Sequence, residues 1–443
     1  MTGTGVIELG EVRHEPPEPT PEPGWSPAAR RWFAALVGLA TLGVTLGAAA
    51  PLPHPLAEAT IPAALGDLAF GEGDTYYVID GSHGRPAGTR TIAAYALPDA
   101  RLRWRAPLPI TGAVRGVGAA EGQMLVSTHP NLLESVETIA VGEDTGRVMW
   151  RRRAQFEGVT PERGNVLLWT APNGVPAAGT GREALEAVEP GTAAVRWSYR
   201  VPVGGWLAYR YHNQRPVRVV TLLPSGRVEV RELEHGHLIA AADGLLPPRR
   251  PAEPSRYVQL AGDLLLVRQD RKVVTAYGLG RLERRWSAEV DPSTEFVSTD
   301  CGATLCVLSR LGGLRVLDPA TGQTRWLKPG WSNPRRVGDR LVVNQTDRRP
   351  GRGPLVVADP ATGRQLGVLG EWLPLGPARP DGRLPGVRID LSTLRAWFAW
   401  LDPVTLSVRV IQAAADIIGD CEARADAILC RRLDASVGVW RLT

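Results

Sequence analysis

Lysine is almost absent from this chain of 443 residues, which contains only Lys272 and Lys328. The chain has 51 lysines and arginines in total, and all the others are arginines. A phosphate-binding loop of the Walker type places its lysine directly after a glycine-rich segment, and neither lysine has such a segment before it. The sequence therefore excludes a nucleotide site of this type.

The short signatures of several other site classes are also missing. There is no GxSxG motif of a hydrolase nucleophile elbow, no CxxC spacing, and no pair of adjacent cysteines. The net charge is +5, and the basic excess after the acidic N-terminal segment is spread over nearly 400 residues without a basic stripe interleaved with aromatics, so we expect no nucleic-acid partner. We also expect no catalytic centre, no cofactor and no metal site.

Long apolar runs are absent except for one near the N-terminus, Trp32–Ala50, which is 19 residues without a charge. A helix of that length spans roughly 28 Å, close to the ~30 Å core of a bilayer. Arg30 and Arg31 precede it and the next basic residue is Arg85, so the positive-inside rule places residues 1–31 in the cytoplasm and the remainder outside. We expect an uncleaved anchor at the cell membrane. The small residues Ala48–Ala50 leave a cleaved signal peptide as the alternative.

The flanks of this run differ from it in composition. Residues 1–31 contain the segment EPPEPTPEP at Glu15–Pro23, and this acidic, proline-rich composition predicts a disordered tail. Residues 51–63 are expected to form a linker, and residues 64–443 a single large domain. That domain accounts for most of the 49 glycines and 38 prolines, which favour many short elements joined by turns.

Tryptophan, in contrast, is abundant: 14 of them stand against 8 tyrosines and 5 phenylalanines. Many end a recurring pattern in which a β-branched run is followed by an acidic turn and then a strand. The clearest copies end at Trp104, Trp150, Trp197, Trp286 and Trp326. Degenerate copies in the same frame end at Ile239, Leu366 and Val408. The mean spacing is about 43 residues, and all-strand repeats of this period indicate a β-propeller.

These repeats predict an all-β propeller of four-stranded blades, preceded by one transmembrane helix. Eight blades are favoured, with seven and nine open. The tryptophans are expected to fill the wedge between neighbouring blades. The last strand pair, residues 427–442, should close the ring with a segment from within residues 56–70.

The segments DPATGQTRW at 318–326 and DPATGR at 359–364 resemble the repeats of the PQQ-like (quinoprotein-like) β-propeller superfamily. This superfamily includes quinoprotein dehydrogenases and an outer-membrane assembly lipoprotein of Gram-negative bacteria. The resemblance implies the fold over nearly the whole exported part. It implies a function only weakly, because the repeat encodes the blade and not a site.

Four cysteines form two local pairs, and three connectivities are possible. Local pairing, Cys301 with Cys306 and Cys421 with Cys430, is favoured because each pair brackets a probable hairpin loop. Three further features are interpreted as parts of turns or as a chance match, and not as functional sites. The aspartates Asp318, Asp359 and Asp402 should cap turns. The pair His235 and His237 should form a solvated turn, with no third metal ligand nearby in sequence. Asn344–Thr346 is a formal glycosylation sequon of little weight.

These observations favour a non-enzymatic binding or scaffold module, displayed outside a membrane and gripping a protein or ligand on the propeller face. Two alternatives stay open. One is an exported enzyme with a site on the propeller axis, which would need several inward acidic or histidine side chains. The other is a sensor that signals through the helix to the cytoplasmic tail, which would need a partner for residues 1–29.

Overall fold

The computed structural model describes residues 58–81, 90–110, 113–129, 136–170, 181, 183–246, 258–270, 272–298, 301–310, 312–346 and 353–442. All of these fall in the unit Pro55–Thr443. The predicted tail and membrane helix lie outside the described residues. Within the described ranges, no helix has the length and apolarity needed to cross a bilayer.

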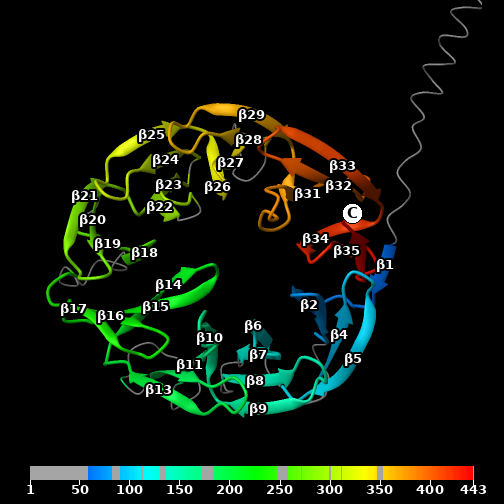
Figure 1. Ribbon diagram of the computed structural model, residues 1–443, viewed down its shortest axis with the longest axis horizontal. Coiled ribbons are helices and arrows are strands. Elements are labelled where there is room, and N and C mark those ends of the chain that lie inside the picture. The colour runs from blue at the N-terminus through cyan, green and yellow to red at the C-terminus, as the bar shows by residue number, and fades with distance from the viewer. Residues whose placement is uncertain are drawn as a thin grey trace, which may run out of the picture. The chain divides into compact units, whose positions relative to one another are not determined.

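The described part of the chain folds into nine sheets, each of four antiparallel strands. The sheets follow one another around a central axis as the blades of a propeller (Figure 1). This confirms the all-β propeller with four-stranded blades. The number of blades is nine, the highest of the three counts left open, and not the favoured eight.

The blades are numbered here in chain order. The strands of blades 1 to 3 are β2 (Leu68–Glu72), β3 (Thr75–Ile79), β4 (Arg90–Ala96), β5 (Arg101–Leu108); β6 (Ala113–Ala120), β7 (Gln123–His129), β8 (Glu137–Gly142), β9 (Val148–Arg152); β10 (Gln155–Val159), β11 (Val166–Thr170), β12 (Ala184–Val188) and β13 (Val195–Arg200). Those of blades 4 to 6 are β14 (Trp206–His212), β15 (Arg215–Leu222), β16 (Val228–Glu232), β17 (Leu238–Ala242); β18 (Val258–Ala261), β19 (Leu264–Arg268), β20 (Val273–Gly278), β21 (Arg284–Glu289); β22 (Glu295–Ser298), β23 (Leu305–Ser309), β24 (Leu314–Leu317) and β25 (Thr324–Lys328). Those of blades 7 to 9 are β26 (Trp331–Val337), β27 (Arg340–Gln345), β28 (Leu355–Ala358), β29 (Gln365–Gly370); β30 (Leu373–Pro374), β31 (Leu384–Asp390), β32 (Arg395–Asp402), β33 (Ser407–Ala414); β34 (Ile417–Arg424), β35 (Ala427–Arg432), β36 (Val437–Arg441) and β1 (Glu58–Ile61).

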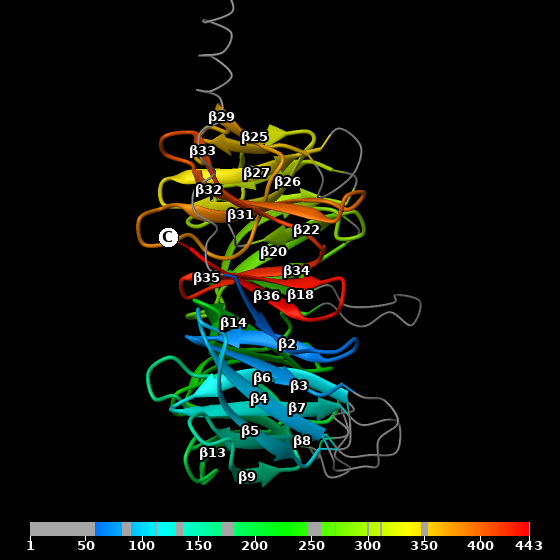
Figure 2. The same cartoon turned by 90° about the vertical axis from the view of Figure 1, so that its right-hand side faces the viewer.

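Both ends of the domain meet in blade 9, whose strand order is β34-β35-β36-β1. Strand β1 pairs antiparallel with β36, so that Glu58 lies opposite Trp440 and Ile61 opposite Val437. The blue first strands and the red last strands of the ring lie side by side in Figure 2. The closing strand therefore comes from the expected range, residues 56–70. The ring begins at Glu58, within the segment expected to be a linker.

The sequence pattern favours eight blades and not nine for a specific reason. Strand β34 was not recognised as a strand, because its pairing with β35 is irregular between Ile417 and Gly419 and again between Gly419 and Glu422. Such bulges break the alternation by which strands are read. The proline-rich unit at 372–412 is a genuine blade whose innermost strand, β30, has only two residues.

The core consists of nine apolar clusters, each between two successive blades. Both faces of a central strand are thereby covered, so its sequence is continuously apolar. The segment LLLVR of β19 and VLLWT of β11 show this. Each large apolar side chain buried in this way contributes about 1.5–3 kcal/mol. Stability therefore depends on every blade having two neighbours.

Candidate interaction surface

The five repeat tryptophans lie on the outermost strands, and each binds the following blade. The indole N–H donates to a backbone carbonyl in the turn between the third and fourth strands of that blade, over 2.5–3.2 Å. The pairs are Trp104–Glu143, Trp150–Pro190, Trp197–Leu233, Trp286–Pro319 and Trp326–Pro360. All five rings also pack in the apolar clusters between two successive blades, where the sequence predicts them.

The turn that receives a tryptophan has a small residue at its left-handed position. At Gly363 (φ +67°) an added Cβ would lie 2.6 Å from the Trp326 ring, so only glycine fits beneath it. At two interfaces between blades the large and the small residue exchange places: the small residue is on the outermost strand and the large one is in the turn of the next blade. These outermost strands have Ala240 and Gly367 at the tryptophan position, one residue beyond the Ile239 and Leu366 of the sequence frame.

Leucine takes the left-handed position opposite these two small residues. Leu406 (φ +57°) reaches within 2.7 Å of where a Cβ of Gly367 would stand. Leu282 (φ +58°) packs in the same cluster as Ala240. A large side chain therefore fills each of these interfaces from one side or the other.

The repeated aspartates cap turns, as predicted. The Asp318 carboxylate accepts hydrogen bonds from Arg325 and from the backbone N–H of Ala320, and these bonds hold the pKa of Asp318 below its usual value. Asp359 and Asp402 accept backbone N–H groups in the same way, with the same effect on their pKa values. These acids are part of the scaffold and do not converge on a site.

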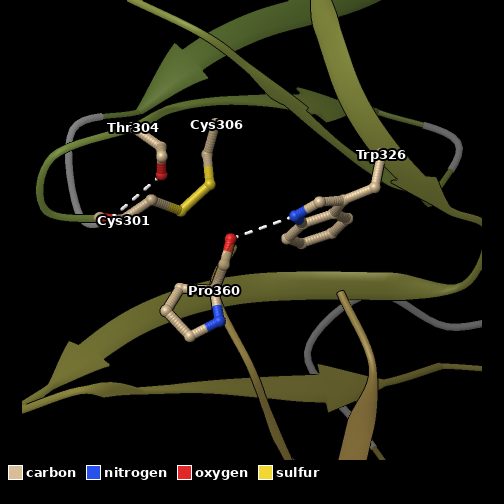
Figure 3. Close-up of a disulfide and its surroundings, with 5 residues drawn as sticks. All are labelled: Cys301, Thr304, Cys306, Trp326 and Pro360. Atoms are coloured by element: carbon tan, nitrogen blue, oxygen red, sulfur yellow. Dashed lines mark hydrogen bonds between the residues drawn. A yellow bond between two sulfur atoms is a disulfide. The ribbon is translucent and has the colours of Figure 1, made fainter. Parts of the chain in front are cut away.

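Both disulfides join local partners, Cys301 with Cys306 and Cys421 with Cys430, which confirms the favoured pairing. Cys301–Cys306 closes the turn between β22 and β23. Its sulfurs lie in one apolar cluster with Trp326, and the Thr304 hydroxyl donates to the Cys301 carbonyl at 3.2 Å (Figure 3). Cys421–Cys430 links β34 to β35 across the irregular pairing of blade 9.

A groove of about 510 Å³ opens between blades 5 and 6, on the face formed by the turns that join first to second and third to fourth strands. Small residues line most of it, so the backbone itself forms much of the wall. The lining residues are Ala261, Gly262, Asp263, Leu264, Gly278, Arg285, Gly302, Ala303, Thr304, Leu305, Pro319 and Ala320, together with Arg210 from blade 4. Such a surface lets an extended polypeptide approach closely, with guanidinium groups beside it.

A hydrogen bond, a disulfide and two ion pairs hold the walls of this groove. Trp286 donates to the carbonyl of Pro319 at 2.8 Å. The Cys301–Cys306 disulfide encloses Gly302–Leu305. Asp263 forms ion pairs with Arg210 (3.1 Å) and Arg218 (3.5 Å) of the preceding blade. The site is thus preformed, which lowers the entropic cost of binding.

The innermost strands expose several large apolar side chains. Trp206 and Tyr211 of β14 are 49% and 52% exposed, and Phe296 of β22 is 43% exposed. Leu373 of β30 and Ile418 of β34 are exposed as well. The β14–β15 hairpin reaches toward the middle of the ring (Figure 1). Exposed aromatic and aliphatic groups are typical of surfaces that bind other proteins.

One carboxyl group on an innermost strand has an unusual protonation equilibrium. Glu157 is the unpaired residue of a bulge in β10, and it accepts a hydrogen bond from Gln155 at 2.9 Å. Burial raises the pKa of Glu157 to about 7, and the neighbouring Tyr209 hydroxyl and Gln155 amide only partly oppose this. Burial and the Glu157 charge raise the pKa of Tyr209 well above 10. This was not predicted, because the bulge that buries Glu157 leaves no mark in the sequence pattern.

A second hollow, of about 410 Å³, lies where blade 9 meets blade 1. Its charged residues hold the two blades together. The Asp67 carboxylate accepts the backbone N–H groups of Ala64 (2.7 Å) and Gly81 (2.9 Å). Arg431 of blade 9 donates to the Asp67 carbonyl at 3.0 Å and to the Ala435 carbonyl at 2.8 Å. We assign this hollow to ring closure.

The resemblance to quinoprotein dehydrogenases raises the question of a quinone and its calcium ion. Calcium needs several converging carboxylates and carbonyls. Among the described residues, the side chains that could hold a metal together are Glu232, His235 and His237, which lie on an outer turn of blade 4. Within the described ranges, the innermost strands thus offer no acidic cluster for calcium.

The sequon at Asn344–Thr346 is an unsuitable acceptor. Asn344 and Thr346 are both buried, at 9% and 6% exposure. The Asn344 amide donates to the Gly353 carbonyl at 3.4 Å. Glycosylation requires an exposed side chain. The three-residue match therefore falls on buried residues at the end of β27 and does not mark a glycosylation site.

Residues 55–230 match the family model described as outer membrane protein assembly factor BamB, which supports the repeat resemblance over less than half of the chain. No curated protein matches the chain. The crystal structure of BamB from Moraxella catarrhalis is 12% identical over 87% of this chain and 97% of that chain, with a TM-score of 0.41. A eukaryotic initiation factor is 11% identical over 80% of this chain and 92% of its own, with a TM-score of 0.50. At this identity the likeness to the initiation factor shows the propeller fold alone.

Proposed function

We propose that the ring is a non-enzymatic binding scaffold that holds a protein partner in the groove between blades 5 and 6. The observation that carries this is the groove itself, about 510 Å³ in volume, walled by small residues and backbone. Trp286 and the Cys301–Cys306 disulfide fix its walls, and neither the indole ring nor the two cysteines line it. The match of residues 55–230 to a family named for assembly of outer-membrane proteins also favours a protein partner.

We further propose that the ring lies outside the cytoplasm, held by a membrane helix at residues 32–50. Two intrachain disulfides favour an oxidising compartment, because cytosolic thiols are kept reduced. N-terminal sequencing of the chain from the membrane fraction tests the anchor. An intact N-terminus supports it, and a mature start near Ala49–Leu52 would refute it in favour of a cleaved signal.

The experiment that tests the groove compares three forms of the full chain as bait in affinity capture from native membranes. Ala303→Trp fills the groove, whereas Val404→Trp adds the same ring to an exposed turn of blade 8 on the same face. We expect the partner to be recovered with the wild type and Val404→Trp, and to be lost with Ala303→Trp. Equal recovery with all three would place the partner elsewhere and refute the proposal.

The described group that most favours an enzyme is Glu157, since a carboxyl with a pKa near 7 can act as an acid or base at neutral pH. Catalysis would also need a second group within reach of the substrate, and the neighbours of Glu157 are Gln155, Tyr209 and Tyr211. A hydrolytic activity abolished by Glu157→Gln and retained by Ala303→Trp would establish the enzyme instead of the scaffold.

A further inference from the structure

The turn between β16 and β17 differs from its counterparts in the other blades. Its sequence, Glu232-Leu-Glu-His-Gly-His237, occupies the place of Asp318–Gln323 in blade 6: Glu232 N pairs with the His237 carbonyl as Asp318 N pairs with that of Gln323. Glu232 thus stands where Asp318, Asp359 and Asp402 cap the turns of blades 6 to 8, and two histidines replace the threonine and the glutamine of blade 6. Both histidines are exposed.

The three side chains already lie within reach of a single ion. The Nδ1 atom of His235 is 3.2 Å from Oε1 of Glu232, and Nδ1 of His237 is 3.8 Å from the same oxygen. One ligand atom from each residue lies within 4.8 Å of the others. The imidazole rings are stacked nearly parallel, with centroids 5.4 Å apart. A small rotation of the exposed His237 would bring all three donors onto one centre.

The backbone fixes the carboxylate while leaving room for a metal. Glu232 accepts the N–H groups of Glu234 and His235, each at 2.8 Å, and that of His237 at 3.4 Å. A carboxylate has about four lone-pair sites, so these three bonds do not exhaust it. Gly236 (φ +74°) packs beneath the ring of Trp197, and this contact anchors the turn to blade 3. The ligands therefore stand on a rigid support, which is what a metal site requires.

We propose that Glu232, His235 and His237 form a surface site for a divalent transition-metal ion such as Cu²⁺ or Zn²⁺. Two imidazole nitrogens and one carboxylate oxygen form a donor set that suits these ions and not Mg²⁺ or Ca²⁺, which prefer all-oxygen ligands. Water completes the coordination, because the site faces solvent. The ion takes the place of the present contact between His235 Nδ1 and Glu232.

The test uses the full chain in detergent, without an affinity tag that contains histidine. Calorimetric titration with Zn²⁺ and electron paramagnetic resonance with Cu²⁺ should each show one site per chain. His235→Ala and His237→Ala should each weaken binding at least about tenfold, since loss of even a residue that only supports a ligand costs that much. Glu232→Gln should weaken it similarly and reduce the number of oxygen ligands seen by resonance.

His212→Ala is the matched control, because His212 is an exposed histidine on the β14–β15 hairpin of the same blade. It should bind the metal as the wild type does. Unchanged thermal midpoints will show that the variants are folded. Wild-type affinity in the doubly substituted His235→Ala/His237→Ala chain would overturn the site. Wild-type affinity in a folded Glu232→Gln chain would overturn the three-ligand assignment.

Discussion

The indole N–H of Trp286 donates to the carbonyl of Pro319 in the following blade, at 2.8 Å. Trp286 belongs to the repeat that specifies the fold, and Pro319 lines the groove between blades 5 and 6. The same contact that packs two blades together therefore also fixes one wall of the candidate site. Through it, the stability of the ring and the shape of the surface depend on each other.

A double-mutant cycle should show that a tryptophan and the next turn are complementary. Trp326→Ala should cost about 3–5 kcal/mol of unfolding free energy, because it empties a buried interface. Gly363→Leu alone should also destabilise, since its side chain would collide with the Trp326 ring. The two substitutions together place alanine on the outermost strand and leucine in the facing turn, as Ala240 and Leu282 are placed between blades 4 and 5. The double variant should therefore be more stable than Trp326→Ala by about 0.5–3 kcal/mol.

Chemical denaturation measures all four forms of this cycle. The matched control is Gly244→Leu, another glycine with positive φ (+69°) but with nothing within 4 Å of an added Cβ. Its effect should simply add to that of Trp326→Ala. A Gly363→Leu substitution that behaves identically with and without Trp326 would contradict the packing described here.

Ring closure should make the C-terminus indispensable. Deleting residues 436–443 removes β36, whose Val437, Val439 and Trp440 are almost fully buried. At about 1.5–3 kcal/mol for each side chain, we expect a loss of roughly 5 kcal/mol or more. Trp206→Ala, at an exposed position, should change the thermal midpoint little. Equal midpoints for the truncated and complete chains would mean that the ends do not close one blade.

The repeat allowed the fold to be predicted because it marks the outermost strand and the turn before it. The count of blades was less predictable, since β34 and β1 lack that mark and only ring closure makes them one sheet. The groove could not be predicted, because Arg210, Asp263 and Ala303 come from three blades far apart in sequence. The third ligand of His235 and His237 was missed, although Glu232 is three residues from His235, because an acid at that position is expected to cap the turn.

The disulfides should contribute to stability independently. Their partners are separated by 5 and 9 residues, and loops of this size give roughly 2–3 kcal/mol each on the chain-entropy model. Replacing Cys301 and Cys306 together by serine should therefore lower stability by up to that amount, and so should replacing Cys421 and Cys430. Peptide mapping without reductant should yield two short intrachain links. A link between Cys301 and Cys421 would contradict the pairing.

Stability should fall between about pH 4.5 and pH 7 because of Glu157. Its pKa is raised from 4.5 to about 7 in the folded chain, so folding favours the protonated form. The stabilisation is complete below the unfolded pKa and is lost as the pH rises through 7. The loss is about 3 kcal/mol in all.

Glu157→Gln should remove this part of the pH dependence and should be more stable than the wild type at pH 8. Thermal unfolding at pH 5 and pH 8 measures the effect. Glu371→Gln, at an exposed glutamate, should leave the difference between the two pH values unchanged. The same slope in the wild type and in Glu157→Gln would show that Glu157 is not the group responsible.

The central claim is that the groove between blades 5 and 6 holds a protein partner, and site-specific photo-crosslinking in living cells tests it most directly. A photoreactive phenylalanine analogue replaces Ala303 in the groove or, as the control, Val404 on the same face of blade 8. Our account predicts one adduct of defined mass from position 303, absent at position 404 and absent without light. No adduct at position 303, or the same adducts from both positions, would contradict it.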